Sequence, residues 1–278
     1  MDPAANVVNQ FTQSAPYWEK YRDVIRTMFA PVTEALIEDA GIARRYRVLD
    51  VATGPGEPAL LIAGLVGTNG NVEGIDVVPE MIAAAQREAE RAGYTNTHFQ
   101  IASADSLPFP EDAFDAVVSR FGVMFFPTPA EGVREMLRVL KPGHKLSMAV
   151  WSYAAQNAFH YVFSRVTEKY IPTPPPEPGA PDAFLFAAPG KLKNILDEAG
   201  AGVSTDRRLE FRIEIPLSID DFWTMRSGMS DRLRAKLAQL PADQFAAVRR
   251  EVNDQLHIYS ADPGLSFPAE VRIVSGSK

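Results

Sequence analysis

Acidic residues and a pair of glycines follow successive apolar segments of this sequence, where they could bind a small polar ligand. Asp50 stands four residues before Gly54, and Gly56 completes a turn that directly follows the apolar segment. Asp76 and Asp105 come after the next two such segments. Glycines let the backbone turn sharply and approach a ligand, and doubly wound sheets bind ligands at the carboxyl ends of their strands. The spacing therefore predicts a ligand site along one edge of a sheet.

This pattern is compatible with two kinds of ligand. Gly54, Gly56 and Ala59 match the dinucleotide-binding pattern, with Asp76 at the appropriate distance, so an NAD(P)-dependent reductase is one interpretation. Asp50 argues against it, because a carboxylate beneath the turn would repel a pyrophosphate but could orient the turn, or a water, near a cationic ligand group. An aspartate after the third strand can accept a hydrogen bond from an adenine amino group. The reductase interpretation also lacks an evident Tyr-x-x-x-Lys pair.

The elements that must position these residues alternate between strands and helices. Short apolar runs predict strands at residues 46–51, 72–76, 98–102, 114–119 and 145–151. Helical spacing, with proline near the start or glycine after the end, predicts helices at 59–66, 80–92 and 131–140. Strands separated by helices indicate right-handed βαβ units and a parallel sheet covered on both faces.

The flanking segments break this alternation. Apolar steps of three and four from Trp18 to Leu36 predict a helix that opens at Tyr17 and Trp18 and is split at Pro31. After residue 151 we expect a helix at 157–170, a proline-rich loop at 172–181, a helix at 189–199, a strand at 208–215, a helical stretch at 219–257 and a strand at 269–274. We expect one domain, residues 1–278, with an N-terminal helical lid at 1–40 and inserted segments at 152–188 and 216–262 that form a substrate cap.

Composition excludes several classes of protein and disfavours others. The formal net charge of −7 disfavours nucleic acid as a partner, and the absence of cysteine excludes disulfides and thiolate chemistry. No cluster of His, Asp and Glu has metal-ligand spacing, so no metal is expected. The first residues lack the features of a signal peptide, and the longest apolar stretches are too short to cross a membrane. We therefore expect a cytoplasmic protein.

Four motifs in order carry a resemblance to a known family. The runs VLDVATGPGEPAL, GIDVVPEMIAAA, SADSLPFPEDAFDAVVSRFGVMFF and EMLRVLKPGHKLSMAVW resemble the class I S-adenosylmethionine-dependent methyltransferases, above all the ubiquinone and menaquinone C-methyltransferase branch, over residues 46–151. The resemblance implies a doubly wound, seven-stranded, mostly parallel sheet of the Rossmann-like methyltransferase type. It also implies S-adenosylmethionine as cofactor and a small-molecule acceptor.

The resemblance assigns roles to particular positions of this chain. The methionyl part of the cofactor would contact Ala52, Thr53, Gly54 and Gly56, above Asp50. Asp76 would bind the ribose hydroxyls, Val77 and Met81 the adenine ring, and Asp105 the adenine amino group, with Ala104 and Ser106 beside it. Ser119, Arg120 and Phe121 would face the reacting methyl group, and the lid would bring Tyr17 and Trp18 to the cofactor. Ala52 and His144 stand where many relatives have glycine.

The acceptor side is less defined by sequence. The predicted pocket residues are Tyr21, Phe125, Trp151 and His160. His160 could act as a general base with a pKa near neutrality, although a structural histidine is the alternative. The aromatic side chains could equally be core, and the acidic residues could be caps. Aromatic content in the added segments favours an apolar or aromatic acceptor. A repurposed cofactor-binding protein without methyl transfer is the remaining alternative, and the oligomeric state is left open.

Overall fold

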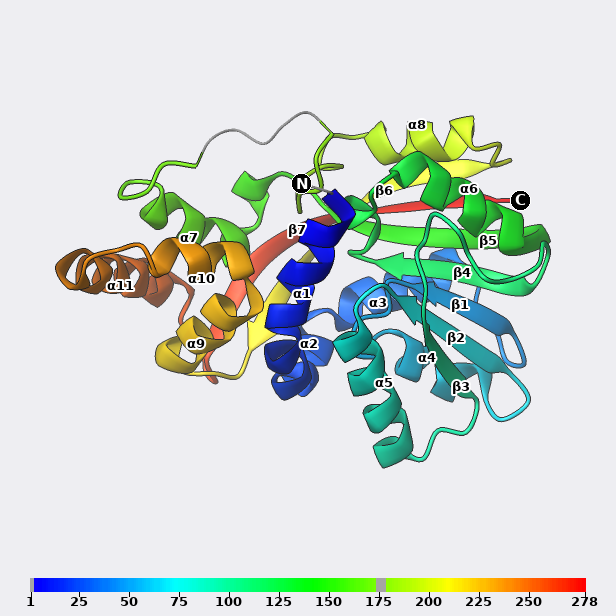
Figure 1. The fold of residues 1–278 in the computed structure, drawn as a ribbon, viewed down its shortest axis with the longest axis horizontal. Coiled ribbons are helices and arrows are strands. Elements are labelled where there is room, and N and C mark those ends of the chain that lie inside the picture. Colours follow the sequence, from blue (N-terminus) through cyan, green and yellow to red (C-terminus); the bar gives the residue numbers. More distant parts are fainter. Residues whose placement is uncertain (1–2, 174–178) are drawn as a thin grey trace.

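The computed structural model describes residues 3–173 and 179–278 and contains one seven-stranded sheet (Figure 1). The strand order is β3-β2-β1-β4-β5-β7-β6. The strands are β1 (Arg47–Val51), β2 (Asn71–Asp76), β3 (Thr97–Ile101), β4 (Phe114–Arg120), β5 (Leu140–Trp151), β6 (Ser204–Ile215) and β7 (Leu265–Ser277). Pairing is parallel from β3 through β5, whereas β7 runs antiparallel to both β5 and β6. The predicted seven-stranded, mostly parallel sheet is confirmed.

The crossover helices are α4 (Ala59–Val66), α5 (Pro79–Ala92) and α6 (Pro129–Val139). The chain steps outward from β1 to β3 in one direction and from β4 to β5 in the other. Right-handed crossovers therefore place α4 and α5 on one face of the sheet and α6 on the other. The strand order reverses between β1 and β4, and this is where sheets of this kind open a crevice for ligands.

The C-terminal half of the sheet differs from the expectation in extent. β6 and β7 pair continuously from Ser204–Gly276 to Ile215–Leu265, although only 208–215 and 269–274 were predicted. β5 begins at Leu140, so the predicted helix to residue 140 and the turn before residue 145 were wrong there. Pro142 and Gly143 lie inside β5, where a shift in pairing register with β4 accommodates them.

The N-terminal segment forms three helices, α1 (Pro3–Lys20), α2 (Arg22–Met28) and α3 (Ala30–Asp39). The prediction that Tyr17 and Trp18 open the helix was wrong, because both lie near the end of α1. Apolar positions at Val7, Phe11 and Ala15 extend the helical face four residues at a time toward the N-terminus. The predicted break near Pro31 is confirmed, since Pro31 lies in the first turn of α3.

A second group of helices packs beyond the carboxyl ends of the central strands (Figure 1). These are α7 (Ala158–Thr167), α9 (Ile219–Met229), α10 (Asp231–Leu237) and α11 (Ala242–Leu256), while α8 (Lys191–Glu198) packs on α6, β6 and β7. The stretch expected to be helical from 219 to 257 is thus three helices, because Ser230 caps α10 and Pro241 precedes α11. Residues 174–178 of the predicted proline-rich loop lie outside the described residues. None of the described helices is long and apolar enough to cross a membrane.

Candidate cofactor and acceptor site

The turn after β1 has the backbone conformations that its glycines predicted. Gly54 has φ +55° and Gly56 has φ +101°, both in the left-handed region. A Cβ on Gly54 would meet no atom within 4 Å, so this glycine faces open space at the strand end. Ala52 also has φ +60°, which explains why glycine is common at its position in relatives. The turn therefore leaves room for a ligand directly above the end of β1.

Asp76 ties the end of β2 to this turn. Its Oδ2 accepts a hydrogen bond from the Gly54 N–H at 2.9 Å, and its Oδ1 accepts one from the Val78 N–H at 3.0 Å. Burial raises the pKa of Asp76 to about 6, against the lowering effect of these backbone hydrogen bonds. Each carboxylate oxygen has a further lone pair, so Asp76 can hold the turn and still accept hydrogen bonds from a ligand.

Asp50 lies beneath the turn and is fully buried. Its Oδ2 accepts a hydrogen bond from the Thr53 hydroxyl at 2.7 Å, while its Oδ1 has no partner among the described residues. Burial raises the pKa of Asp50 to about 7, and the Thr53 hydrogen bond and the Arg120 guanidinium oppose this rise. Near neutral pH this group therefore changes charge directly below the predicted cofactor turn.

The end of β3 offers a third carboxylate. Asp105 Oδ1 is enclosed and has no hydrogen-bond partner among residues 3–173 and 179–278. Burial and the nearby charge of Glu131 raise the pKa of Asp105. Ala104 is buried beside it, whereas Ser106 is exposed. Asp105 thus presents one carboxylate oxygen without a partner at the edge of the sheet, where it was predicted to bind the adenine amino group.

The order of the strands arranges these groups in a line. Asp105, Asp76, the Gly54 turn, Phe121 and Trp151 follow or end β3, β2, β1, β4 and β5, which are neighbours in that order. The carboxyl ends of parallel strands meet at one edge of a sheet, so the line runs from the acidic end at β3 to the aromatic end at β5. An elongated ligand that is polar at one end would match this edge.

Helix α1 lies over part of this line, between α5 and the added helices (Figure 1). Ala15 forms a small buried cluster with Val78 and Met81, against which Phe11, Trp18 and Val77 also pack. The indole Nε1 of Trp18 is enclosed without an acceptor among the described residues. Trp18, Val77 and Met81, all predicted to contact the cofactor, are therefore brought together.

Tyr17 faces a different neighbour from Trp18. A Cβ on Gly228 of α9 would lie 2.1 Å from the Tyr17 ring, so this ring packs flat against the glycine backbone. Phe11 meets Phe125 edge-to-face at 5.2 Å between ring centroids. Through these contacts α1 bridges the strand ends and the added helices. The role of Phe11 could not be predicted from the sequence, because an aromatic residue on an amphipathic helix is more often part of the core than of a site.

Arg120 and Ser119 complete the end of β4 beneath the surface. The Arg120 guanidinium donates to the Thr33 hydroxyl at 2.7 Å and to the Glu57 carbonyl at 3.2 Å. It therefore points toward α3 and the turn after β1. Ser119 Oγ is buried without a partner in the described part of the chain and would be 2.7 Å from a Cβ on Gly122. Ser119 thus retains hydrogen-bonding capacity at the strand end, whereas the guanidinium of Arg120 is already hydrogen-bonded within the protein.

Aromatic rings extend from the end of β4 into the added helices. The Phe121 and Trp151 rings stack at 4.5 Å with an interplanar angle of 4°. Trp151 then meets His160 edge-on at 4.5 Å, and His160 meets Phe159 at 5.1 Å. Trp151 and His160, both predicted pocket residues, are thereby joined. Tyr21 is buried in the main core instead.

His160 does not have the predicted pKa near neutrality. Burial lowers its pKa well below 6.5, and the positive charge of Arg226 lowers it further. Its Nε2 is enclosed with no hydrogen-bond partner among the described residues. His160 is therefore a neutral imidazole at physiological pH, and the expectation of a near-neutral base is corrected because the sequence could not show its burial beside a cation.

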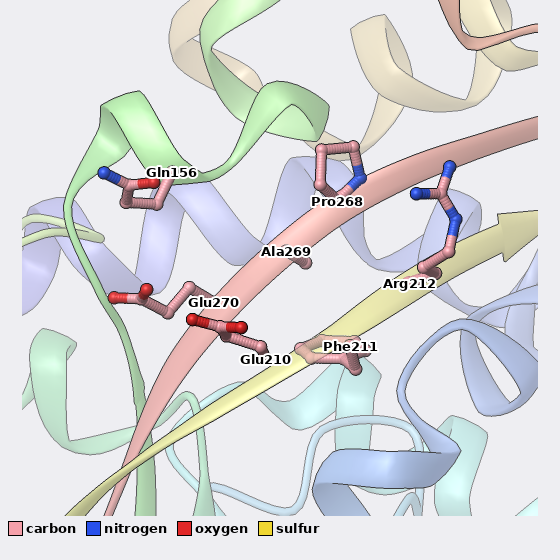
Figure 2. A pocket seen from close by; sticks show the side chains of 7 residues that line it. All are labelled: Gln156, Glu210, Phe211, Arg212, Pro268, Ala269 and Glu270. Carbon is pink, nitrogen blue, oxygen red and sulfur yellow. The ribbon is translucent and has the colours of Figure 1, made fainter.

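Two surface hollows lie away from this edge. One, of about 370 Å³, lies over β6 and β7 (Figure 2) and is lined by Gln156, Glu210, Phe211, Arg212, Pro268, Ala269 and Glu270. The carboxylates of Glu210 and Glu270 lie side by side there (Figure 2). The other lies beside α7 near Tyr161 and Arg165. Neither contains a residue that the sequence assigned to the cofactor.

Comparisons with known proteins address the family directly. A family model described as a methyltransferase domain matches residues 42–200. The chain belongs to the methyltransferase-domain family. The ubiquinone/menaquinone biosynthesis C-methyltransferase UbiE of Geotalea daltonii is 32% identical over 125 residues, which are 43% of this chain and 53% of that protein. The similarity to UbiE lies within the methyltransferase domain, the cofactor of this family is S-adenosylmethionine, and the comparisons do not favour the reductase interpretation.

Two further matches describe the extent of the likeness. An uncharacterized protein of Mycobacterium tuberculosis is 31% identical over 190 residues, which are 68% of this chain and 66% of that protein. The chain thus matches just under two thirds of the length of that relative. The crystal structure of YcgJ from Bacillus subtilis has a TM-score of 0.59 at 20% identity and covers 90% of this chain and 98% of its own. This likeness supports the Rossmann-like methyltransferase fold.

The residues along the sheet edge suit the cofactor of this methyltransferase family. Four enclosed polar atoms without partners in the described residues lie on the strand ends or on α1, namely Asp50 Oδ1, Asp105 Oδ1, Ser119 Oγ and Trp18 Nε1. Buried polar atoms normally have hydrogen-bond partners, so unused ones mark places where a ligand can supply them. S-adenosylmethionine carries an adenine amino group, ribose hydroxyls and an amino-acid end, which can supply such partners. The open space above Gly54 provides the close backbone approach.

Proposed function

We propose that this protein transfers the methyl group of S-adenosylmethionine to a small organic acceptor with an apolar or aromatic body. When bound, the cofactor supplies a methyl group on a sulfonium, and an in-line displacement breaks its C–S bond as the acceptor forms the new bond. S-adenosylhomocysteine is then the second product. The acceptor's proton, if it carries one, passes to water.

The observation that carries this proposal is the continuous aromatic wall beginning at the end of β4. Phe121 stacks on Trp151, and Phe29 contacts both rings at 5.2 and 5.7 Å. Aromatic surfaces of this kind bind flat apolar groups and exclude water. Because the Gly54 turn lies on the neighbouring strand β1, an acceptor on this wall would be adjacent to the methionyl end of the predicted cofactor site.

The protein's contribution would be alignment rather than proton transfer. The methyl group is already activated, and positioning two reactants correctly can lower a barrier by roughly 7–11 kcal/mol in favourable cases. His160 contacts Trp151 of this wall at 4.5 Å, but its lowered pKa makes it a weak base. We infer that His160 orients the acceptor through its unpartnered Nε2.

Two measurements test this proposal in sequence. Isothermal titration with S-adenosylhomocysteine, with NADH as control, should show micromolar binding of the former alone. Methyl transfer should then be measured with isotopically labelled cofactor against a panel of phenols, aromatic acids and quinols, with products identified by mass spectrometry. Binding of NADH alone would refute the cofactor assignment. Tight cofactor binding without transfer to any acceptor would favour a repurposed member of the family.

A further inference from the structure

Arg226, on α9, is a buried cation without a counterion among the described residues. It is 8% exposed, and its Nε is enclosed with no acceptor. No hydrogen bond or ion pair joins its guanidinium to any residue in 3–173 or 179–278. Burial alone lowers the pKa of Arg226 to about 10, with no carboxylate opposing the shift. At neutral pH this largely buried side chain therefore carries a positive charge that no carboxylate of the described residues pairs with.

A second buried arginine shows how the same chain normally treats such a group. Arg272 is 9% exposed, and it forms an ion pair with Asp206 at 2.7 Å. A buried guanidinium without a partner is strongly unfavourable, whereas a paired one is tolerated. The missing partner of Arg226 is thus a specific feature of its site.

Aromatic side chains surround Arg226 on the side that faces α7. Its guanidinium carbon lies 4.4 Å from the Phe159 ring centroid and 5.9 Å from that of Phe163. These cation–π contacts recover part of the desolvation penalty but supply no hydrogen-bond acceptor. The Nε–H of Arg226 has no acceptor among the described residues, so it remains available for a ligand.

The surroundings of Arg226 connect to the acceptor wall. Phe159 also contacts His160 at 5.1 Å, and His160 contacts Trp151 at 4.5 Å and Phe184 at 5.5 Å. The charge of Arg226 lowers the pKa of His160, which places the two side chains in one electrostatic environment. One cluster of aromatic rings thus contacts two polar side chains, Arg226 and His160, each with a nitrogen that has no partner among the described residues.

We propose that Arg226 binds an anionic group of the acceptor, so that the substrate class is an aromatic carboxylate. A carboxylate can accept two parallel hydrogen bonds from the edge of a guanidinium, and its negative charge would pair with the positive charge of Arg226. The rings that follow from Phe159 to Trp151 then hold the aromatic body toward the end of β4. His160 Nε2, beside the Trp151 and Phe159 rings, would provide a second polar contact to the acceptor. This inference rests on the proposed methyl transfer and adds to it the chemistry of the acceptor.

The test uses full-length protein and probes that differ only in charge. Wild-type protein saturated with S-adenosylhomocysteine is titrated with 2-naphthoate and with 2-naphthamide, and the titration is repeated for Arg226→Met. Arg249→Met is the matched control, because Arg249 also lies over a ring, that of Trp223 at 5.8 Å, but is exposed and paired with Asp220. We expect the wild type and the control to prefer 2-naphthoate, and Arg226→Met to bind it at least about 30-fold more weakly while binding 2-naphthamide unchanged.

Thermal unfolding without any probe separates a binding role from a structural one. If Arg226 serves a ligand, replacing it by apolar methionine removes an unpaired buried charge and should raise Tm by about 2–4 °C. A lowered Tm, or failure of both Arg226→Met and Arg226→Gln to fold, would assign Arg226 a structural role and overturn the proposal. Equal affinity of the wild type for the acid and the amide would overturn it as well. If the wild type does not bind S-adenosylhomocysteine, the proposed function is refuted. The comparison of Tm values for wild type and Arg226→Met would still decide the role of Arg226.

Discussion

Substituting Asp50 by asparagine should change how the stability of this protein depends on pH. The carboxyl is fully buried beneath the Gly54 turn, and its Oδ2 accepts a hydrogen bond from the Thr53 hydroxyl. An asparagine oxygen can accept the same bond, so the variant keeps this contact and removes the titration, while its amide NH2 takes the place of the second carboxylate oxygen. Burial raises the pKa of Asp50 from 3.8 to about 7 in the folded protein.

The sign and size of the effect follow from this shift. As the pH rises above about 4, Asp50 ionises in the unfolded chain but remains protonated in the folded one. The folded state is therefore progressively destabilised from about pH 4 to about pH 7, and the loss is complete above that range. A shift from 3.8 to about 7 corresponds to about 4 kcal/mol over the whole window, and somewhat more than half of it falls between pH 5 and 8.

Urea unfolding of wild type and Asp50→Asn at pH 5, 6, 7 and 8 measures this difference. From pH 5 to pH 8 the free energy of unfolding of the variant should rise relative to that of the wild type by about 2–3 kcal/mol, because titrations of other groups cancel in the comparison. Asp115→Asn is a control in which the pKa shift, and therefore the effect on stability, has the opposite sign to that of Asp50. Its pKa is lowered, because the Arg47 backbone N–H and Lys141 outweigh the effect of burial, so its loss should weaken the protein at neutral pH. Parallel stability curves for wild type and Asp50→Asn would refute the reasoning.

Three further predictions concern the cofactor edge, and all are read out by titration with S-adenosylhomocysteine and by urea unfolding. Asp76→Ala removes the carboxylate that holds the Gly54 N–H and should weaken binding at least 30-fold, or about 2 kcal/mol; unchanged affinity would exclude Asp76 from the site. Gly54→Ala should abolish binding while lowering the free energy of unfolding by only about 1 kcal/mol. Gly56→Ala should lower the free energy of unfolding more, because its Cβ would lie within 3.4 Å of atoms on α4 and α5. Equal losses of stability in the two variants would contradict this. Trp18→Phe keeps the packing on α5 but removes the unpartnered indole N–H, so weaker binding at unchanged stability is expected, and unchanged binding would assign Trp18 to packing alone.

The central part of the fold could be predicted because its signals are local. Each strand from β1 to β4 is a short segment with apolar residues, bounded by glycine, proline or polar residues, and α4 was predicted with the bounds that it has. The parallel arrangement then follows from the alternation of strands and helices. That arrangement brings Asp50, Asp76 and Asp105 to one edge, although nothing in the sequence shows that all three carboxyls would be enclosed enough to raise their pKa values.

The rest depends on contacts between distant segments. β6 alternates exposed and half-buried positions over most of its length, so its first residues have no strong apolar pattern and their pairing with β7 fixes the strand. Arg226 lies in a segment that was predicted to be helical, but a single arginine on a helix is normally exposed. Only the packing of α9 near Phe159 and Phe163 of α7 buries it.

The attachment of α1 differs between its two neighbours. Its polar contacts with α5 are the exposed Glu19–Arg87 ion pair and the Thr12–Glu80 hydrogen bond, and exposed pairs of this kind stabilise a fold by about 0–1 kcal/mol each. On the other side, the Tyr17 ring packs against Gly228 of α9, and Gln13 accepts a hydrogen bond from Arg234 of α10. We infer that a cofactor contacting both α1 and α5 would strengthen the attachment between these two helices, because its binding energy adds to their weak polar contacts.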